Sequence, residues 1–284
     1  MADTTFLKDN LSGSVPVEIS SEVIKNIIDQ ASVFKICKHE PMTSDTKDLP
    51  YLTDNGSATW VSEGGVIGTA IPEFSYPQLK ACKLAVIIPI TREKINDSVI
   101  SVLEECKGAI ADSFANAIDK AVIFGTDSPF TTNLFTAAGT QTKTAGVGTL
   151  DGDISAAMGL VEANKLTCTD ILMGTAQKQP LRTLTNSSGF KGAITLSAAY
   201  DLPIEFVKEW DNTKALSVIG DFTKAVIGTR EEIEYQVLDQ ATIGTGEAAI
   251  NLAERDMVAV KATMRLAFVV AEPKAFSLIV PPVA

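Results

Sequence analysis

The chain has 284 residues, of which 45% are hydrophobic and 21% charged; this composition supports a large core of up to two domains and excludes global disorder. The longest apolar run, residues 84–90, is far shorter than the roughly 18 residues of a membrane-spanning helix. The net charge is −11 and no Lys/Arg cluster of five or more occurs, so sequence-specific nucleic-acid binding is not expected. Residues 1–5 lack the features of a signal peptide, which predicts a soluble protein made in the cytosol.

The N-terminal part is predicted to be an extended arm followed by a short helix. Residues 1–17 are polar and show no periodicity. Ser20 or Ser21 can cap a helix that ends near Cys37, because Pro41 prevents its continuation. The apolar residues of this helix recur at helical spacing: Val23, Ile27, Ala31 and Phe34.

Residues 43–80 differ from the rest of the chain, because glycine and proline alternate with aromatic residues and neither helical nor strand periodicity persists. Such a long irregular segment is expected in a compact domain only where it is functional. One interpretation is a surface loop with a weak hairpin. The other is a projecting arm that packs on a neighbouring chain, since an isolated hairpin is marginally stable in water. In the second case Trp60 is a candidate anchor.

The strongest local patterns are a strand at 80–90 followed by a long helix at about 98–124. Pro89 indicates that the strand is at a sheet edge or ends there. Gly125 supplies the helix stop, and the length corresponds to about 39 Å. The apolar stripe is too irregular for a coiled coil and predicts a helix lying against a sheet; it consists of Val99, Leu103, Cys106, Ile110, Phe114, Ala117 and Ala121.

The second half of the chain alternates between helix and strand patterns, after a Thr/Gly/Ala-rich domain crossing at 126–150. The closing strands need partners, and the strand at 80–90 is the only earlier one left unpaired. We therefore expect both closing strands to return to the first domain. The predicted elements are helices at 153–165 and 176–185, strands at 171–173, 204–207, 216–219, 225–228 and 233–238, and closing strands at 257–270 and 275–280.

Histidine and cysteine usage argues against a metal or catalytic site. His39 is the only histidine, which excludes multi-histidine metal sites and predicts an exposed or hydrogen-bonded structural residue. The four cysteines form no CxxC pair, so we expect reduced, mostly buried thiols: Cys37, Cys82, Cys106 and Cys168.

Other motif-like segments also lack the required residues. Residues 151–162 resemble a calcium loop, but Ala156 replaces the glycine of the sharp turn, so a helix is favoured. The pairs at 104–105 and 231–232 are adjacent glutamates in charge-rich segments and are better explained as solvated faces than as acid/base groups. No phosphate loop, nucleophile elbow or HExxH motif occurs. We therefore predict a protein that is not an enzyme and has no cofactor, metal or catalytic residues.

The order of these elements resembles the major capsid protein family of tailed phages, which has the Hong Kong 97-like fold. The resemblance covers nearly the whole chain, and the order of its segments is more specific than any one of them. It implies an α+β fold with an N-terminal arm, an extended loop, a peripheral domain containing a long spine helix, and a mixed α/β axial domain. The segments are VPVEI (15–19), LPYL (49–52), ATWVSEG (58–64), LAVIIPITRE (84–93), AIDKAVIFG (117–125) and AVKATMR (259–265).

The resemblance also implies boundaries for these parts. They are an arm at 1–17, a helix and connector at 18–44, an extended loop at 45–80, a peripheral domain at 81–144 plus 256–284 with its spine helix at about 98–124, and an axial domain at 145–255. The extended loop is then expected to contact neighbouring subunits. Its candidate contact residues are Tyr51, Trp60, Glu63, Phe74 and Tyr76.

The implied function is self-assembly into an icosahedral shell of pentamers and hexamers around double-stranded DNA. The DNA would be held without sequence-specific binding, and an acidic lining would let it slide during packaging. Other implied partners are a portal protein and scaffolding or decoration proteins, with no membrane. The implied location is the virion capsid, assembled in the host cytoplasm.

Two departures from the family pattern matter. Some members cross-link a loop lysine to an asparagine of another subunit, but residues 52–79 contain no lysine, which predicts non-covalent locking. Some members carry a cleaved N-terminal scaffolding segment. Here Met1 directly precedes the arm, so we expect scaffolding to be absent or supplied by another protein.

Three alternatives stay open at this point. An encapsulin-type bacterial nanocompartment shell shares the fold but encloses an enzyme cargo; the glycine-rich loop and acidic arm favour the phage. A soluble two-domain α/β enzyme is disfavoured by the single histidine and missing phosphate loop. A small-ligand binding module would be a compact monomer.

Overall fold

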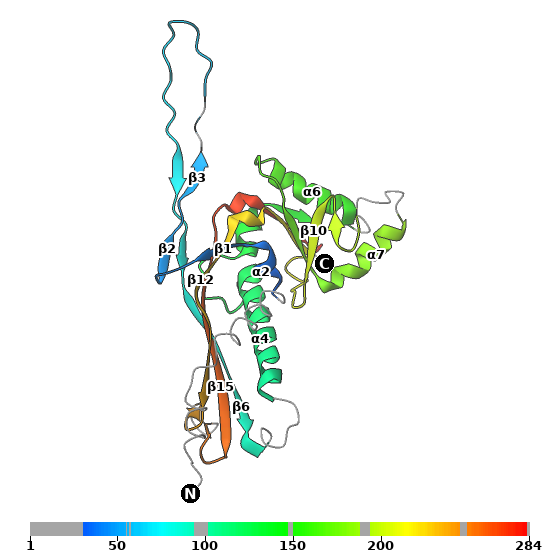
Figure 1. The fold of residues 1–284 in the computed structure, drawn as a ribbon. Helices are drawn as coiled ribbons and strands as arrows, with labels where there is room; N and C mark the ends of the chain where they lie inside the picture. Colours follow the sequence, from blue (N-terminus) through cyan, green and yellow to red (C-terminus); the bar gives the residue numbers. More distant parts are fainter. Residues whose placement is uncertain are drawn as a thin grey trace.

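The structure is a computed structural model that describes residues 31–54, 56, 58–93, 102–146, 150–187, 194–244 and 249–282. Figure 1 shows an elongated molecule in which a long helix lies beside two groups of strands and a hairpin projects beyond both. The predicted arm and the first part of the predicted N-terminal helix lie outside the described residues. Within the predicted range, α2 (Ser32–Ile36) begins after Ala31, whose backbone is extended, and it ends before Cys37, close to the predicted end. The prediction of one helix that continues through Ala31 is therefore wrong.

The first sheet contains the predicted strand at 80–90 and one of the closing strands. Its strands, in order, are β1 (Lys38–Pro41), β12 (Ala225–Leu238), β15 (Met257–Val270) and β6 (Cys82–Thr91). The antiparallel pairing of β6 with β15 runs from Thr91 opposite Met257 to Cys82 opposite Leu266. The return of a C-terminal strand to this region is therefore confirmed. The edge position of β6 agrees with Pro89, because proline cannot donate a ladder hydrogen bond.

The second sheet is mixed and contains the other closing strand. Its strands, in order, are β7 (Thr142–Thr144), β16 (Phe276–Val280), β11 (Ser217–Gly220), β8 (Asp170–Gly174), β10 (Leu202–Val207) and β9 (Ala198–Ala199). The prediction that both closing strands return to the first domain, where the strand at 80–90 lies, is wrong for β16, which lies between β7 and β11 in the six-stranded sheet. The physical reason is burial, because residues 276–279 are all buried and such an apolar strand needs cover on both faces.

The strands predicted at 225–228 and 233–238 are one continuous strand, β12, and the prediction of two strands is wrong. Polar residues 230–232 interrupt the apolar pattern in the sequence. In the structure the pairing with β15 shifts register on both sides of Glu231, which indicates β-bulges. The strand therefore continues through the polar residues, and Glu231 is exposed. Three strands therefore lie in a different sheet from the one that the predicted domain boundaries imply: β12 is in the four-stranded sheet, and β7 and β16 are in the six-stranded sheet.

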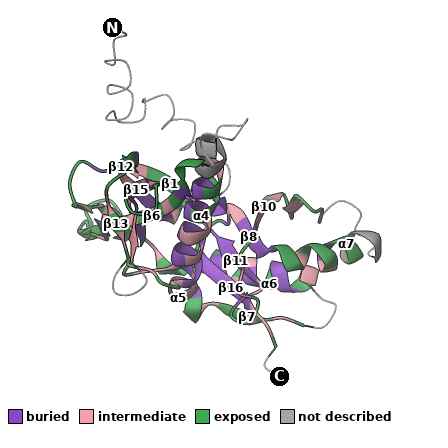
Figure 2. Ribbon diagram, turned by 90° about the horizontal axis from the view of Figure 1, so that it is seen from below, coloured by how far each residue is buried: buried purple, intermediate pink, exposed green. Residues whose placement is uncertain are grey.

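The predicted long helix is α4 (Val102–Phe124), and its start upstream of Val102 lies outside the described residues. It ends at Gly125, whose φ of +66° is the left-handed conformation typical of a helix stop. The buried face of α4 is wider than the predicted stripe. It includes Ala111, Ala115 and Val122, while Ala117 is only half-buried. The buried face is wide because both sheets pack against α4, and residues of both sheets belong to the same core (Figure 2).

The six-stranded sheet has a second core of its own. The helices α6 (Leu150–Glu162) and α7 (Lys178–Ser187) pack on it (Figure 2). The helix α6 confirms that the calcium-loop-like segment is helical. Smaller elements complete the described chain: β2 (Thr46–Asp48), β3 (Tyr51–Asp54), β4 (Glu73–Ser75), β5 (Gln78–Lys80), α5 (Leu134–Ala137), β13 (Thr242–Ile243) and β14 (Ile250–Asn251).

The predictions for histidine and cysteine agree with the structure where it describes them. His39 is exposed on β1, and its Nε2 lies 2.6 Å from the carbonyl oxygen of Phe34. Cys37 and Cys168 are buried free thiols, whereas Cys82 is half-buried. The side chain of Cys106 lies outside the described residues. In the described ranges, no three potential metal ligands come together, and no helix is long and apolar enough to cross a membrane.

Candidate functional site

The most distinctive surface of the molecule is the segment between β2 and β5, which projects away from both sheets (Figure 1). Its base is two short antiparallel pairs, β2 with β5 and β3 with β4. At the far end the N–H of Gly65 donates to the carbonyl of Ser62 at 2.9 Å. Gly64, at the third position of this turn, has a φ of +79°, which is typical of a type II turn. The segment is therefore a long hairpin loop closed by a glycine turn, and we call residues 51–75 the projecting loop.

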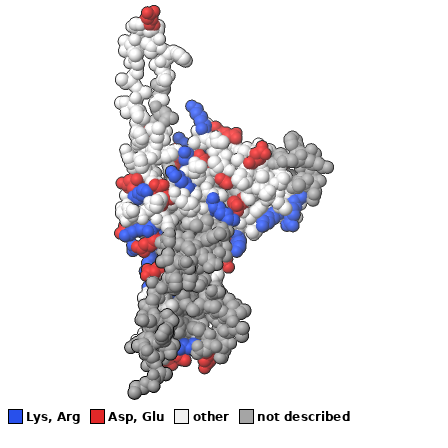
Figure 3. Space-filling model, viewed as in Figure 1, with Lys and Arg blue, Asp and Glu red and all other residues white. Residues whose placement is uncertain are grey.

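Large apolar side chains of the projecting loop face solvent. Trp60 is fully exposed, and Val66, Ile67 and Ile71 keep 94%, 80% and 81% of their surface accessible. A single exposed apolar residue needs no explanation, but a contiguous group of them marks an interaction surface. Figure 3 shows acidic atoms at the tip and no basic ones along the loop on the face in view, in agreement with a segment 52–79 that contains no Lys or Arg.

The structure separates the five predicted contact residues into two groups. Trp60, Glu63, Phe74 and Tyr76 are exposed. Tyr51 is half-buried at the base, where the Nζ of Lys224 lies 5.2 Å from the centre of its ring, so it contacts its own chain.

Sequence reasoning missed Val66, Ile67 and Ile71 because it considered mainly aromatic anchors. The sequence did contain a signal for these exposed residues, because β-branched residues occur in a glycine-rich segment that lacks the alternation of a strand.

The base next to the projecting loop is fixed to the four-stranded sheet. Asp45 forms ion pairs with Arg230 of β12 and with Arg265 of β15, the second at 3.4 Å. Buried Leu79 and Met42 pack on the same face of this sheet. Met42 approaches Gly228 so closely that a Cβ there would lie 2.4 Å from its sulfur. The loop therefore projects from a firmly attached base.

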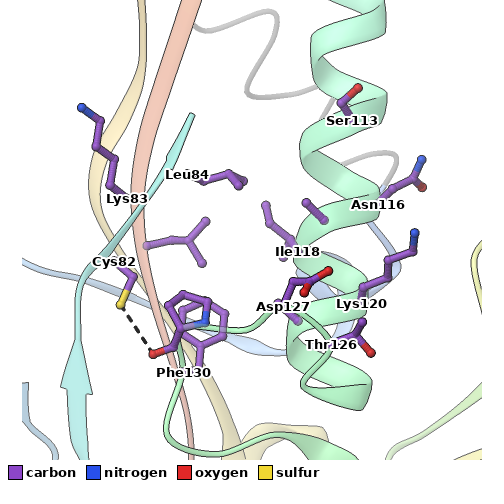
Figure 4. Close-up of a pocket in the computed structure, with 14 residues that line it drawn as sticks. Cys82, Lys83, Leu84, Ser113, Asn116, Ile118, Lys120, Thr126, Asp127 and Phe130 are labelled. Atoms are coloured by element: carbon purple, nitrogen blue, oxygen red, sulfur yellow. Dashed lines mark hydrogen bonds between the residues drawn. The ribbon is translucent and has the colours of Figure 1, made fainter. Parts of the chain in front are cut away.

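The second candidate surface is an open pocket of about 670 Å³ between β6 and α4, closed at one end by residues 126–130. Figure 4 shows Leu84 and Ile118 pointing toward each other across it, and Cys82 close to the backbone beside Phe130. Lys83 and Lys120 are also among its lining residues, and Lys120 forms an ion pair with Glu209. The lining is thus mainly apolar, and Figure 4 shows the amino groups of Lys83 and Lys120 pointing away from the space between β6 and α4. The rest of the lining is Ser113, Asn116, Ala117, Ala121, Thr126, Asp127, Pro129 and Leu266.

Solved structures define the class of this fold. A chain from Microbacterium phage Oxtober96 superposes with a TM-score of 0.78 at 26% identity, covering 89% of this chain and 91% of that one. A chain from Mycobacterium phage Cain gives a TM-score of 0.76 at 29% identity, with 90% and 91% covered. The fold is the Hong Kong 97-like fold of tailed-phage capsids, which confirms the predicted class.

Sequence comparisons identify the family. The model of the phage capsid family matches residues 13–280. The major capsid protein of Staphylococcus phage 80alpha is 26% identical over 292 residues, covering 98% of this chain and 88% of that protein. The chain belongs to the phage capsid family: it is a viral structural protein that associates with copies of itself in the shell of a virion.

Proposed function

We propose that this chain is the main subunit of an icosahedral shell of pentamers and hexamers that encloses the double-stranded DNA of a tailed phage. The observation that carries the proposal is the projecting loop, which presents large apolar side chains that stay exposed and whose base packs on the four-stranded sheet. A relative described as a major capsid protein supports the same role. The four-stranded sheet with α4 then forms the peripheral domain, and the six-stranded sheet forms the axial domain.

In this proposal the projecting loop docks on a neighbouring copy. Burying one large apolar side chain contributes about 1.5–3 kcal/mol, so several such residues in many identical contacts stabilise a closed shell. The pocket between β6 and α4 offers a matching surface. It is mainly apolar, as are the exposed side chains of Trp60, Val66 and Ile67 on the projecting loop.

The locking of the shell is proposed to be non-covalent. The segment 52–79 has no lysine that could form a bond to an asparagine of another subunit. Assembled particles boiled in detergent should therefore release a single band near 30 kDa. A ladder of covalent oligomers would contradict this part of the proposal.

The remaining partners follow from the shell role. A net charge of −11 suits an inner surface along which DNA slides without being bound at specific sequences. A portal protein and separate scaffolding or decoration proteins are proposed partners, and assembly is proposed to occur in the host cytoplasm. We propose no catalytic activity and no cofactor for this chain.

The test is the size and content of the purified particle. Light scattering and negative-stain microscopy of the expressed chain should show rings or closed shells, and particles from infected cells should contain DNA. Shells filled with an enzyme would instead indicate a nanocompartment. A monomer near 30 kDa under all salt and protein concentrations would contradict the proposal and favour an enzyme or a ligand-binding module.

A further inference from the structure

A buried carboxylate on the spine helix carries an inference that is independent of the loop contacts. Asp119 of α4 is only 4% exposed. Its two oxygens accept hydrogen bonds from the backbone N–H groups of Ser32 and Val33, each at 3.2 Å. These N–H groups are at the start of α2, where the N-cap residue Ala31 provides no side-chain cap. Asp119 therefore caps a helix that lies more than 80 residues away in the sequence.

The same junction includes the second sheet. The hydroxyl of Ser32 donates to the carbonyl of Phe206 on β10 at 3.3 Å. Lys35 of α2 forms an ion pair with Glu205 of β10 at 3.6 Å. The start of α2 is thus held by α4 on one side and by β10 on the other.

Each element packed at this junction contributes titratable groups that face or influence Asp119. Lys35 is the cation on α2, and its charge is shared with Glu205 of β10. The buried thiol of Cys37 follows α2; its pKa is raised by burial and further by the negative charges of Asp119 and of Asp170 on β8. Burial raises the pKa of Asp119 to about 6, against the opposing effects of the two backbone hydrogen bonds and Lys35. Desolvation therefore outweighs the partners that favour the charged form.

We propose that Asp119 is a proton-responsive latch that fixes the start of α2 to the spine helix and holds it more tightly when the carboxyl group is neutral. When α2 detaches, water can hydrate the carboxylate again, so ionisation favours the detached state. A neutral carboxyl group needs no such hydration. Its carbonyl oxygen still accepts one of the two backbone hydrogen bonds, and the avoided desolvation cost outweighs the loss of the other. Because α2 leads into β1 and the base next to the projecting loop, the latch controls how this segment is fixed to the fold.

The direction of the pH effect follows from the two states. With α2 attached the carboxyl titrates near pH 6, and with α2 detached it titrates near its ordinary value of 3.8. Between these values the attached state binds more protons, so attachment strengthens as the pH falls through 6 and is strongest below 3.8. From pH 7.5 to pH 5 the ratio of attached to detached α2 should rise roughly tenfold.

The test is amide hydrogen exchange of residues 32–37 in the full chain, with protection factors corrected for the intrinsic pH dependence of exchange. The wild-type protein should show about tenfold higher protection at pH 5 than at pH 7.5. The variant Asp119→Asn should show no such difference, because its side chain does not titrate. A flat wild-type profile, or the same pH dependence in Asp119→Asn, would overturn the proposal.

Two further variants separate the latch from a general structural effect. Asp112→Asn removes an exposed carboxylate of α4 that forms an ion pair with Lys208, and it should retain the wild-type pH dependence. Ser32→Ala removes the bond to Phe206 but leaves both backbone bonds to Asp119. It should lower protection at every pH and keep the tenfold difference, so the proposal stays testable even if Asp119→Asn does not fold. Loss of the difference in Ser32→Ala would assign the pH effect to the β10 contact instead.

Discussion

The projecting loop and the junction of α2, α4 and β10 show opposite uses of side-chain chemistry. The loop exposes Trp60 and three β-branched residues to solvent. The junction buries a carboxylate and supplies its hydrogen-bond partners from the same chain. The loop, which we propose is covered by other copies, can leave apolar groups exposed in the free subunit. A buried carboxylate instead needs hydrogen-bond partners within the subunit, because an unpaired buried charge is costly. Variants in the two regions should therefore affect different steps, assembly in one case and subunit folding in the other.

The largest expected effect is in the shared core. Phe114 of α4 is fully buried among residues of both sheets. Phe114→Ala should lower the free energy of unfolding of the subunit by about 3–5 kcal/mol, measured by urea denaturation of unassembled chain. A loss below 1 kcal/mol would show that α4 is not the common core of the two sheets.

The two tryptophans provide a matched comparison. Trp60→Ala should weaken assembled particles by about 2 kcal/mol per contact and leave the unfolding of the free subunit unchanged. Trp210 donates from Nε1 to the carbonyl of Ala215 at 2.6 Å and packs on Phe124, so Trp210→Ala should destabilise the free subunit by about 3 kcal/mol. Thermal melting of particles and of free subunits measures both. The comparison fails if Trp60→Ala particles melt like wild type.

Assembly should depend on the free volume of the pocket between β6 and α4. Ala117 lines it from α4 and is half-buried. Ala117→Phe should fill much of the space and reduce assembly at least tenfold, as measured by the fraction of sedimenting particles, while the circular dichroism of the subunit stays unchanged. Ala117→Ser, which conserves the volume, is the control and should assemble normally. Normal assembly of Ala117→Phe would show that the pocket is not the docking surface.

The smallest expected effect is at the attached base. Asp45 pairs with Arg230 and Arg265 but is itself largely exposed, so Asp45→Asn should cost the subunit only about 0.5–1 kcal/mol. The loss should shrink at high salt, because partly exposed ion pairs are screened. Equal losses at low and high salt would mean that packing of Met42 and Leu79, rather than charge, fixes the base.

Local sequence patterns predicted an element correctly where its conformation depends on residues close to it in the sequence. The spacing of apolar residues in 98–124 predicted α4, and Gly125 predicted its end. Pro89 predicted that the strand at 80–90 lies at a sheet edge or ends there, and the irregular composition of 43–80 predicted a segment outside the core. In each case the residue types act locally: glycine and proline restrict the backbone conformations of the chain, and a segment without a regular apolar pattern cannot form a buried element.

Contacts between distant segments could not be read in the same way. The polar residues 230–232 suggested a break in a strand that the bulges allow to continue, and β16 joined the second sheet because its fully buried run required it. The sequence analysis assigned no role to Asp119, because its partners Ser32 and Val33 are distant in the sequence. The pocket likewise depends on the separation of β6 and α4, which no single segment specifies.

The sequence by itself determined most of the helices and strands, the separation of residues 43–80 from the core, and the absence of basic residues from 52–79. These properties depend on periodicity, turn residues and composition, which act over a few residues. Only the tertiary structure decided which sheet each closing strand joins, that Asp119 caps α2, and where a pocket opens beside the spine helix. Those features depend on burial and pairing between residues far apart in the chain. The segments that pack against a carboxylate or an apolar strand determine how far it is removed from water.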